Sequence, residues 1–573
     1  MSYLAIQNFA FHKRITDVRR FSEYLLPYWD KQLVLFICMG FSVLFSLVQP
    51  FFARLVIDYA LLGGDLHIFN TLLFVGILSY LFSIPIECMQ KAAGFYLTTR
   101  VSLGLRSSFY RKLQLLSLRF SQSRSVGEHL YRLGTDLDSV LQLIVSTIPS
   151  AIILFVRLSL LLVVCFWIDF RLTLVLLLIS PVIYWHTVYF TRLQKSISTL
   201  MITHTQGISS RLQQALAQML LIKIFGREKR EYVRFIGDTI SLIRLNIRNL
   251  RLAIVRGESG RLLNASITGG ITYFLGYQVI KAQLTLGQLT AISMYLFQLN
   301  DTIRSVGGLY NDFVIKFIAL DRVVETLDAS IEVQEIERPL RNWQQNGELQ
   351  LSNVSFAYRE GNSVLNAVSL HLSRGEKVLL TGDVGSGKST LCHLLMRLYD
   401  PTAGAILLDG HDIRQLKLDT LRGAIGFAGS EPMLFQDTVK NNICFGSSVT
   451  ELEEIIKVAE VVGIHRRILE LPLGYDTFLE TGEDRLSLGE KQSICLARAL
   501  IKRPEILVLD EAFSSLDKNR VEAIASNISK LYKDMTSLII THHYINPDWL
   551  DRTVTLKDGI IEEAGPVSYM QRS

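Results

Sequence analysis

Residues 377–389 have the sequence KVLLTGDVGSGKS, which carries the most specific pattern in the chain. The apolar segment KVLLT predicts a short strand, and STLCHLLMRLY, which begins at Ser389, predicts a helix. Glycine-rich residues ending in Lys-Ser join the two, which is the order required of a phosphate-binding P-loop. The loop consists of Gly382, Asp383, Val384, Gly385, Ser386, Gly387, Lys388 and Ser389, and Thr390 follows in the predicted helix.

Each residue type in this loop has a role in binding a nucleoside triphosphate. Glycines let the backbone curl, so that successive N–H groups and the N-terminus of the next helix face phosphate oxygens. Lys388 would add a positive charge near the β- and γ-phosphates, and Ser389 would supply an oxygen to Mg²⁺. ATP and Mg²⁺ are therefore the expected cofactors, and an accidental glycine-rich turn is a poor alternative in this context.

A second motif completes the expected site. Residues 506–511, ILVLDE, predict a buried strand that ends in two carboxylates, Asp510 and Glu511. Asp510 is placed to reach the Mg²⁺ shell, and Glu511 to polarise an attacking water as a general base. Two acids after a strand are otherwise an ordinary solvated end, so this assignment depends on the P-loop.

The rest of the C-terminal half has the pattern of a soluble α/β domain. From residue 348 onward, strand-like segments such as LQLSNVSFAY, ILLD and SLIITHH alternate with helical ones. This alternation predicts a doubly wound nucleotide-binding domain, which we assign to residues 347–573. Residues 318–346, which are acidic and weakly apolar, are expected to form a linker.

The N-terminal half differs in composition. The first 320 residues hold 32 Lys and Arg against 16 Asp and Glu, whereas the rest of the chain holds 27 against 37. The basic residues alternate with long apolar runs, which is typical of loops between membrane spans and not of a nucleic-acid surface. We therefore expect a membrane domain and no nucleic-acid partner.

Six stretches are long and apolar enough to cross the roughly 30 Å hydrocarbon core of a bilayer as helices. They cover residues 33–60, 68–95, 139–167, 170–192, 258–280 and 285–316. The short connections between them carry only Arg171 and Lys281, so both termini and the two long loops are expected in the cytoplasm. The prediction is a six-span domain over residues 33–317. Residues 1–32 are expected to form a cytoplasmic N-terminus and an interfacial elbow helix.

Together these features resemble an ATP-binding cassette (ABC) half-transporter of the exporter type, in which six spans are fused to one cassette. The resemblance covers essentially the whole chain. It implies an all-α six-helix transmembrane domain followed by an α/β P-loop NTPase cassette. Further matches to the family's motifs are Tyr358 for the adenine-stacking aromatic, Ser487 and Gly489 in the signature LSLGE, Asp517 in the D-loop, and His542 for the switch histidine, with His543 the weaker candidate.

In this family, ATP lies between the P-loop of one cassette and the signature of another. The resemblance therefore implies a dimer with twelve spans and two composite sites, in which Ser487 and the N–H of Gly489 would meet the γ-phosphate. It also implies that the cytoplasmic loops dock on the cassettes through short helices, which we place near 125–137 and 209–222. The implied partners are the lipid bilayer, a second half-transporter in a homodimer or heterodimer, and a transported small molecule or peptide.

Three features depart from the family pattern. The signature has Leu488 in place of a glycine and Glu490 in place of a glutamine, which puts bulk and negative charge near a polyanion. Ser430 occupies the position of the Q-loop glutamine and is too short to reach Mg²⁺ in the same way. Residues 481–485, TGEDR, resemble a shortened coupling loop. The signature changes are expected to weaken phosphate binding or closure of the cassettes, and the serine in the Q-loop to weaken their coupling to the spans.

Arg157 is the most informative residue within the predicted spans. It lies near the middle of the third span, where a charge usually faces a cavity or a partner. It favours a peptide or an anionic amphiphile as the substrate. A structural pairing with Glu87, with Asp58 or with a carbonyl is an equally weighted alternative.

The expected activity is ATP hydrolysis that drives export or flipping of a hydrophobic or amphiphilic substrate, such as a peptide, a drug-like molecule or a lipid, by alternating access. Two alternatives remain open. One is a catalytically weakened partner subunit of a heterodimeric transporter, and the other is an importer with the exporter fold. The expected location is the bacterial inner membrane, with the cassette in the cytoplasm.

Overall fold

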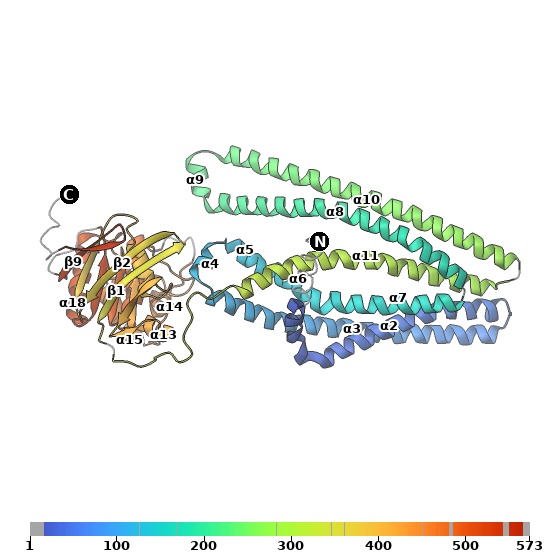
Figure 1. The fold of residues 1–573 in the computed structure, drawn as a ribbon, viewed down its shortest axis with the longest axis horizontal. Helices are drawn as coiled ribbons and strands as arrows, with labels where there is room; N and C mark the ends of the chain where they lie inside the picture. Colours follow the sequence, from blue (N-terminus) through green and yellow to red (C-terminus); the bar gives the residue numbers. More distant parts are fainter. Residues whose placement is uncertain are drawn as a thin grey trace. The chain divides into compact units, whose positions relative to one another are not determined.

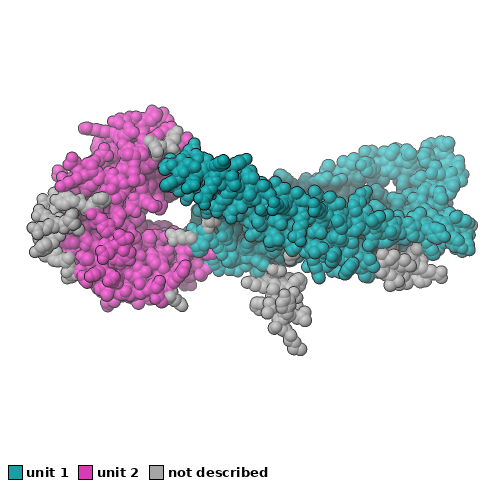
Figure 2. Space-filling view, turned by 90° about the horizontal axis from the view of Figure 1, so that it is seen from above, with its two compact units in different colours: residues 1–115, 121–329 teal, residues 116–120, 330–573 magenta. Residues whose placement is uncertain are grey.

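The chain forms two compact units (Figure 2). The computed structural model describes residues 16–124, 126–168, 170–281, 283–344, 346–359, 361–449, 451–480, 485–542 and 549–564. Unit 1 consists of Met1–Leu115 and Ser121–Ala329, and unit 2 of Leu116–Phe120 and Ser330–Ser573. Unit 1 is helical, and unit 2 contains all of the described strands. The predicted fold class, an all-α domain followed by an α/β domain, is confirmed.

Long helices make up unit 1 (Figure 1). They are α2 (Trp29–Leu55), α3 (Leu66–Leu115), α7 (Ile148–Ile168), α8 (Phe170–Ala217), α10 (Glu228–Ile280) and α11 (Leu286–Asp328). The shorter segments are η1 (Glu23–Tyr28), η2 (Val56–Leu61), α5 (Val126–Tyr131), η3 (Arg132–Asp136), α6 (Leu137–Gln142), η4 (Leu143–Thr147) and α9 (Met219–Ile224). Helices thus cover all six predicted spans, and α11 continues into the stretch predicted as linker.

Apolar surface marks the membrane-spanning part of unit 1. The helical stretches of the described residues that are long and apolar enough to cross a membrane are Thr16–Leu61, Leu66–Leu115 and Val126–Ile168. They expose large side chains such as Phe74, Phe155 and Trp167, as expected of a surface that faces lipid. The other predicted spans lie on α8, α10 and α11, where Gly, Ser, Thr and Gln dilute the apolar pattern of the last two.

Helices α8 and α10 form an antiparallel pair, which diverges from the other helices of unit 1 at the end that carries α9 (Figure 1). The α9 end of this pair exposes Leu220, Ile224 and Phe225. A cavity of about 700 Å³ lies between the ends of α8 and α10. Its lining includes Phe225, Arg211 and Tyr232. An exposed apolar groove of this kind is typical of a surface that another element covers.

Charged residues tie the first long loop to α11 within unit 1. Arg132, 4% exposed, donates hydrogen bonds to the carbonyl of Arg322 (3.1 Å) and to Thr326 Oγ1 (2.8 Å). Arg322 pairs with Asp136 at 3.0 Å, and the Asp136 side chain is almost fully buried. Because a buried charge is costly without a partner, these contacts hold the loop against the last turns of α11.

Two sheets form the core of unit 2. The six-stranded sheet has the order β10-β9-β3-β8-β7-β6, and the four-stranded sheet has the order β2-β1-β4-β5. The strands are β1 (Leu349–Arg359), β2 (Asn362–Leu372), β3 (Lys377–Thr381), β4 (Ala403–Leu408), β5 (His411–Asp412), β6 (Ile425–Ala428), β7 (Ile506–Asp510), β8 (Thr536–Ile540), β9 (Arg552–Lys557) and β10 (Ile560–Ala564). Strands β3, β8, β7 and β6 are parallel neighbours. Their carboxyl ends therefore meet at one edge of the sheet, with β3 and β7 on either side of β8.

Short helices connect the strands of unit 2. They are α12 (Lys388–Leu395), α13 (Leu418–Ala424), α14 (Val439–Cys444), α15 (Leu452–Val461), α16 (His465–Leu469), η5 (Gly474–Asp476), α17 (Leu488–Leu500) and α18 (Lys518–Leu531). The apolar residues of β7 and β8 are fully buried, as expected of parallel strands that are covered on both faces.

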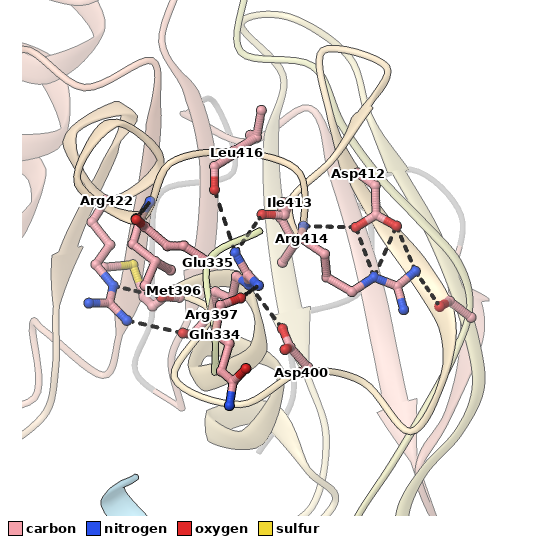
Figure 3. Close-up of polar contacts among 12 residues, drawn as sticks. Gln334, Glu335, Met396, Arg397, Asp400, Asp412, Ile413, Arg414, Leu416 and Arg422 are labelled. Carbon is pink, nitrogen blue, oxygen red and sulfur yellow. Dashed lines mark hydrogen bonds and ion pairs between the residues drawn. The ribbon is translucent and has the colours of Figure 1, made fainter. Parts of the chain in front are cut away.

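A buried arginine anchors part of the predicted linker on the cassette (Figure 3). Arg397 is 1% exposed and pairs with Asp400 at 2.9 Å. It also donates a hydrogen bond of 2.9 Å to the carbonyl of Gln334 and one of 3.3 Å to the carbonyl of Ile413. The stretch after α11 is therefore part of the cassette's polar network, and it is held there by backbone contacts that composition cannot reveal.

Part of the first long loop packs in unit 2, ahead of the stretch in which docking was expected. Leu116–Phe120 belongs to unit 2, where Leu118 packs against the core around the four-stranded sheet and Arg119 pairs with Glu332 at 3.2 Å. The predicted position, 125–137, lies further along the chain, where the described residues pack on α11 instead. Both segments mix apolar and charged residues in sequence, and only their tertiary partners distinguish them.

Candidate functional site

The P-loop joins β3 to α12 as predicted. Gly385 and Gly387 have φ angles of +87° and +106°, which disfavour residues with a side chain. A Cβ atom on Gly387 would lie 2.7 Å from Leu365 Cδ2, and one on Gly382 would collide with the carbonyl of Leu556. Glycine is therefore required by backbone angle and by space at Gly382 and Gly387, and by backbone angle alone at Gly385.

The side chains of the loop converge on its interior. Lys388 is 8% exposed, and its ammonium donates hydrogen bonds to the carbonyls of Gly382 (2.7 Å) and Asp383 (2.8 Å). The Ser386 hydroxyl is buried and has no hydrogen-bond partner among the described residues. Val384, at the tip, is almost fully exposed. A buried cation and an unpaired hydroxyl at the N-terminus of α12 suit an anionic group such as phosphate.

Asp510 ends β7 close to the start of α12. Burial raises the pKa of the Asp510 carboxyl above its ordinary value, and the hydrogen bond from the Ser389 hydroxyl works in the opposite direction. A hydroxyl and a carboxylate at one point form the hard oxygen set that Mg²⁺ prefers. The residues present therefore fit the Mg²⁺ ion that the sequence predicts.

Glu511 and His542 lie side by side. Glu511 follows β7 with a φ angle of +54°, and its N–H donates to the carbonyl of Ile540 (2.8 Å) at the end of β8. His542 follows β8, and its Nε2 lies 3.4 Å from Glu511 Oε1. The turn after each strand thus directs one side chain toward the other. His543 lies outside the described residues.

Tyr358 and Thr390 lie at the other side of the P-loop helix. The Tyr358 hydroxyl is 3.1 Å from Thr390 Oγ1, and its ring packs edge-on against Phe356 and Tyr399. Tyr358 is half-buried in this aromatic cluster. The predicted adenine-stacking residue therefore lies within hydrogen-bond reach of α12.

The signature residues begin α17. Ser487 is the N-cap, where its hydroxyl accepts a hydrogen bond from the Glu490 N–H while the Glu490 carboxylate accepts one from the Ser487 N–H. Gly489 is buried against the D-loop, since a Cβ atom there would lie 2.7 Å from the carbonyl of Ser515. Leu488 is 56% exposed, so its bulk points away from the helix packing. Residues 481–484 of the predicted coupling loop lie outside the described residues.

The D-loop aspartate and the Q-loop position have structural roles in the described residues. Asp517 is the N-cap of α18, where its carboxylate accepts a hydrogen bond from the Arg520 N–H at 2.9 Å. Ser430 follows β6, and its carbonyl accepts a hydrogen bond from Gln492. The replacement of the Q-loop glutamine by serine therefore leaves a backbone contact at this position.

Gln492 is a residue that the sequence analysis missed. Its side chain is buried on α17 and donates to the carbonyl of Ser430 (3.1 Å) and to Ser514 Oγ (2.8 Å). Its carbonyl oxygen accepts a hydrogen bond from the Ser515 N–H at 3.0 Å. One amide thus joins the Q-loop position, the signature helix and the D-loop. The sequence held one sign of this role, because Gln492 lies on the same helical face as Gly489 and Leu496.

Gln492→Leu is expected to lower the rate of ATP turnover by roughly tenfold, because it removes the amide that joins the Ser515 N–H and the Ser430 carbonyl to α17. Binding of ATP to the chain's own P-loop should change little, since Gln492 contacts none of its residues in the described structure. The matched control is Asn527→Leu, which removes a single amide contact to the Val461 carbonyl in the same cassette. Equal losses in both variants would show that Gln492 serves stability alone.

Arg157 lies on α7, and its Nε is buried without a hydrogen-bond partner among the described residues. Both suggested carboxylates have other partners. Glu87 pairs with Lys91 at 2.7 Å, and Asp58 accepts a hydrogen bond from the Gly287 N–H at 2.9 Å. Neither contact involves Arg157, so the two suggested carboxylate pairings are not formed among the described residues.

Two family models match the chain. Residues 33–303 match the model described as ABC transporter transmembrane region, and residues 365–514 match the model described as ABC transporter. The chain belongs to the ABC transporter family. This ABC transporter is similar to the ATP-dependent lipid A-core flippase of Syntrophus aciditrophicus (strain SB), with 28% identity over 559 residues that cover 98% of this chain and 93% of the flippase.

A solved structure supports the same assignment for both units. A bacterial Atm1-family ABC exporter with ATP bound superimposes with a TM-score of 0.83 and 25% identity, covering 94% of this chain and 95% of the exporter. The predicted resemblance is thereby confirmed. This ABC transporter is a multi-pass membrane protein that binds ATP and couples its hydrolysis to export or flipping of a substrate.

Proposed function

We propose that the chain is one half of a dimeric exporter, in which the signature of each cassette completes the ATP site of the other. The pairing of Glu511 with His542 beside a complete P-loop carries this proposal. Ser487 and Gly489 lie on α17, and no hydrogen bond in the described residues joins them to that set. A second cassette is therefore the natural source of the missing contacts.

Each residue of the composite site has a defined task. Lys388 would exchange its two carbonyl contacts for phosphate oxygens, and Ser389 and Asp510 would hold Mg²⁺, which would supply charge neutralisation at the phosphates. Glu511 accepts the proton of the attacking water, and His542 orients that carboxylate through the contact of 3.4 Å. Ser487 and the N–H of Gly489 approach the γ-phosphate from the partner at the positive end of α17.

The surface of unit 1 supports a partner as well. The exposed apolar end at α9, with its cavity of about 700 Å³, suits docking of the second long loop on a neighbouring cassette. The cassette and both termini lie in the cytoplasm, and the membrane is the bacterial inner membrane. Arg157 lines the translocation path and favours a peptide or an anionic amphiphile.

The test is the ATPase rate of the chain purified alone in lipid nanodiscs, with its oligomeric state determined on the same sample. Lys388→Ala is the control for contaminating activity. Steady hydrolysis by a dimer of this chain, lost in the control variant, is the expected result. A folded chain that binds ATP but shows no turnover above the control would contradict the homodimer.

That second outcome would favour the alternative role of a weakened subunit in a heterodimer. The specific observation behind this alternative is the signature, where the Glu490 carboxylate occupies the place of a neutral amide. Co-purification of a second half-transporter that restores turnover would then identify the working unit.

A further inference from the structure

The negative charge that this chain carries in its signature is balanced by a specific neighbour. Both carboxylate oxygens of Glu490 are engaged: Oε2 accepts a hydrogen bond of 2.8 Å from the Ser487 N–H, and Oε1 lies 3.1 Å from Arg467 Nε. The Glu490 side chain is 15% exposed. The carboxylate is therefore held in one position beneath the start of α17, and it does not project freely into solvent.

Arg467 is itself fixed on three sides. It lies on the short helix α16, where NH1 pairs with Glu470 at 3.0 Å. NH2 donates a hydrogen bond of 3.0 Å to the carbonyl of Arg485, the residue that precedes the signature LSLGE. Nε faces Glu490. Only a planar guanidinium can serve three partners in these directions at once, and a lysine ammonium cannot.

The Glu490 carboxylate lies in the first turn of α17, where its charge affects the binding of anions. The N-terminus of a helix attracts anions, and the proposed function brings a polyphosphate to this one. An unpaired carboxylate in the first turn would repel that polyphosphate. A pair with a guanidinium offsets the charge of the Glu490 carboxylate and so reduces this repulsion.

We propose that Arg467 is a positioning residue of the composite ATP site, which neutralises Glu490 and holds it against the Ser487 N–H. This inference rests on the proposed function, because the phosphate that it concerns belongs to the ATP of the partner cassette. With Glu490 held as the acceptor for the Ser487 N–H, the Ser487 hydroxyl accepts a hydrogen bond of 3.3 Å from the Glu490 N–H and donates none among the described residues. Its proton is left to donate to a phosphate oxygen.

The experiment compares ATP hydrolysis by the full-length transporter in nanodiscs across four variants. Arg467→Met should raise KM for ATP by roughly tenfold with a smaller change in kcat, because the defect is repulsion of the incoming phosphate. Glu490→Gln added to Arg467→Met should restore KM to within about threefold of the wild type, since no charge then needs balancing. Glu490→Gln alone is the reference for the double variant, because it measures what the carboxylate by itself contributes to KM.

Arg466→Met is the matched control, because it removes the same charge from the exposed side of the same helix. A KM for Arg467→Met that equals the control's, or that Glu490→Gln fails to restore, would overturn the inference while leaving the proposed function intact. A wild-type chain without turnover would instead overturn the proposed function, and the inference with it. A structural role alone would lower the melting temperature of Arg467→Met without any rescue by Glu490→Gln.

Discussion

Glu511→Gln should lower ATP turnover by ~100-fold or more, because it removes the carboxylate that accepts a proton from the attacking water. The glutamine side chain has nearly the same shape, so the contact with His542 can persist while the basic oxygen is lost. ATP binding should be retained, since Lys388 and Ser389 are unchanged. The measurement is steady-state phosphate release in nanodiscs, together with binding of a fluorescent ATP analogue.

The control for this variant is Glu505→Gln, which neutralises a half-buried carboxylate just before the opposite end of the same strand, β7. Its turnover should stay within about threefold of the wild type, because Glu505 lies away from the edge at which the P-loop and Glu511 meet. If Glu511→Gln also stayed within that range, Glu511 would not be the base, and proton transfer would have to pass through another group.

The P-loop and its carboxylates could be predicted because each is a continuous motif whose geometry is local. Gly385, Gly387 and Lys388 adopt the positions that the pattern requires, and Asp510 ends its strand as expected. The pairing of Glu511 with His542 needed the order of strands in the sheet, and it could be predicted only through the resemblance to a family.

Gln492 and Arg467 could not be found in the same way. Their partners, such as Ser430, Ser514 and Glu490, lie 22 to 62 residues away in the chain. The position of Gln492 on the helical face with Gly489 and Leu496 indicates burial, but it does not indicate which groups the amide contacts. The unusual signature drew attention to Glu490. The arginine that pairs with it, Arg467, could be identified only from the fold.

The helical unit shows the same limit at its boundaries. Hydropathy located the spans, but the helices continue far beyond any bilayer, as α3 does with its 50 residues. The segment Leu116–Phe120, which packs in the cassette unit, lies ahead of the expected docking stretch near 125–137, because amphipathic loops have the same pattern whether they face α11 or a cassette.

Arg322→Met should destabilise the transporter by about 3 kcal/mol, the low end for removing one partner of a buried ion pair. The change leaves the Asp136 carboxylate, whose side chain is 2% exposed, without its partner at 3.0 Å. Arg322 is itself 37% exposed, which is why the low end of the range applies. The measurement is the apparent melting temperature of the full-length protein in nanodiscs, compared across variants under identical conditions.

Two further variants separate this cause from simple loss of a side chain. Asp136→Asn added to Arg322→Met should recover much of the lost melting temperature, because it removes the buried charge. Arg106→Met breaks an ion pair with Asp138 whose members are 44% and 50% exposed, so it should cost less than about 1 kcal/mol. If Arg322→Met melted at the same temperature as Arg106→Met, the pair of Arg322 with Asp136 would add no measurable stability, and the loop would be held to α11 by Arg132 and by apolar residues such as Val140 and Leu320.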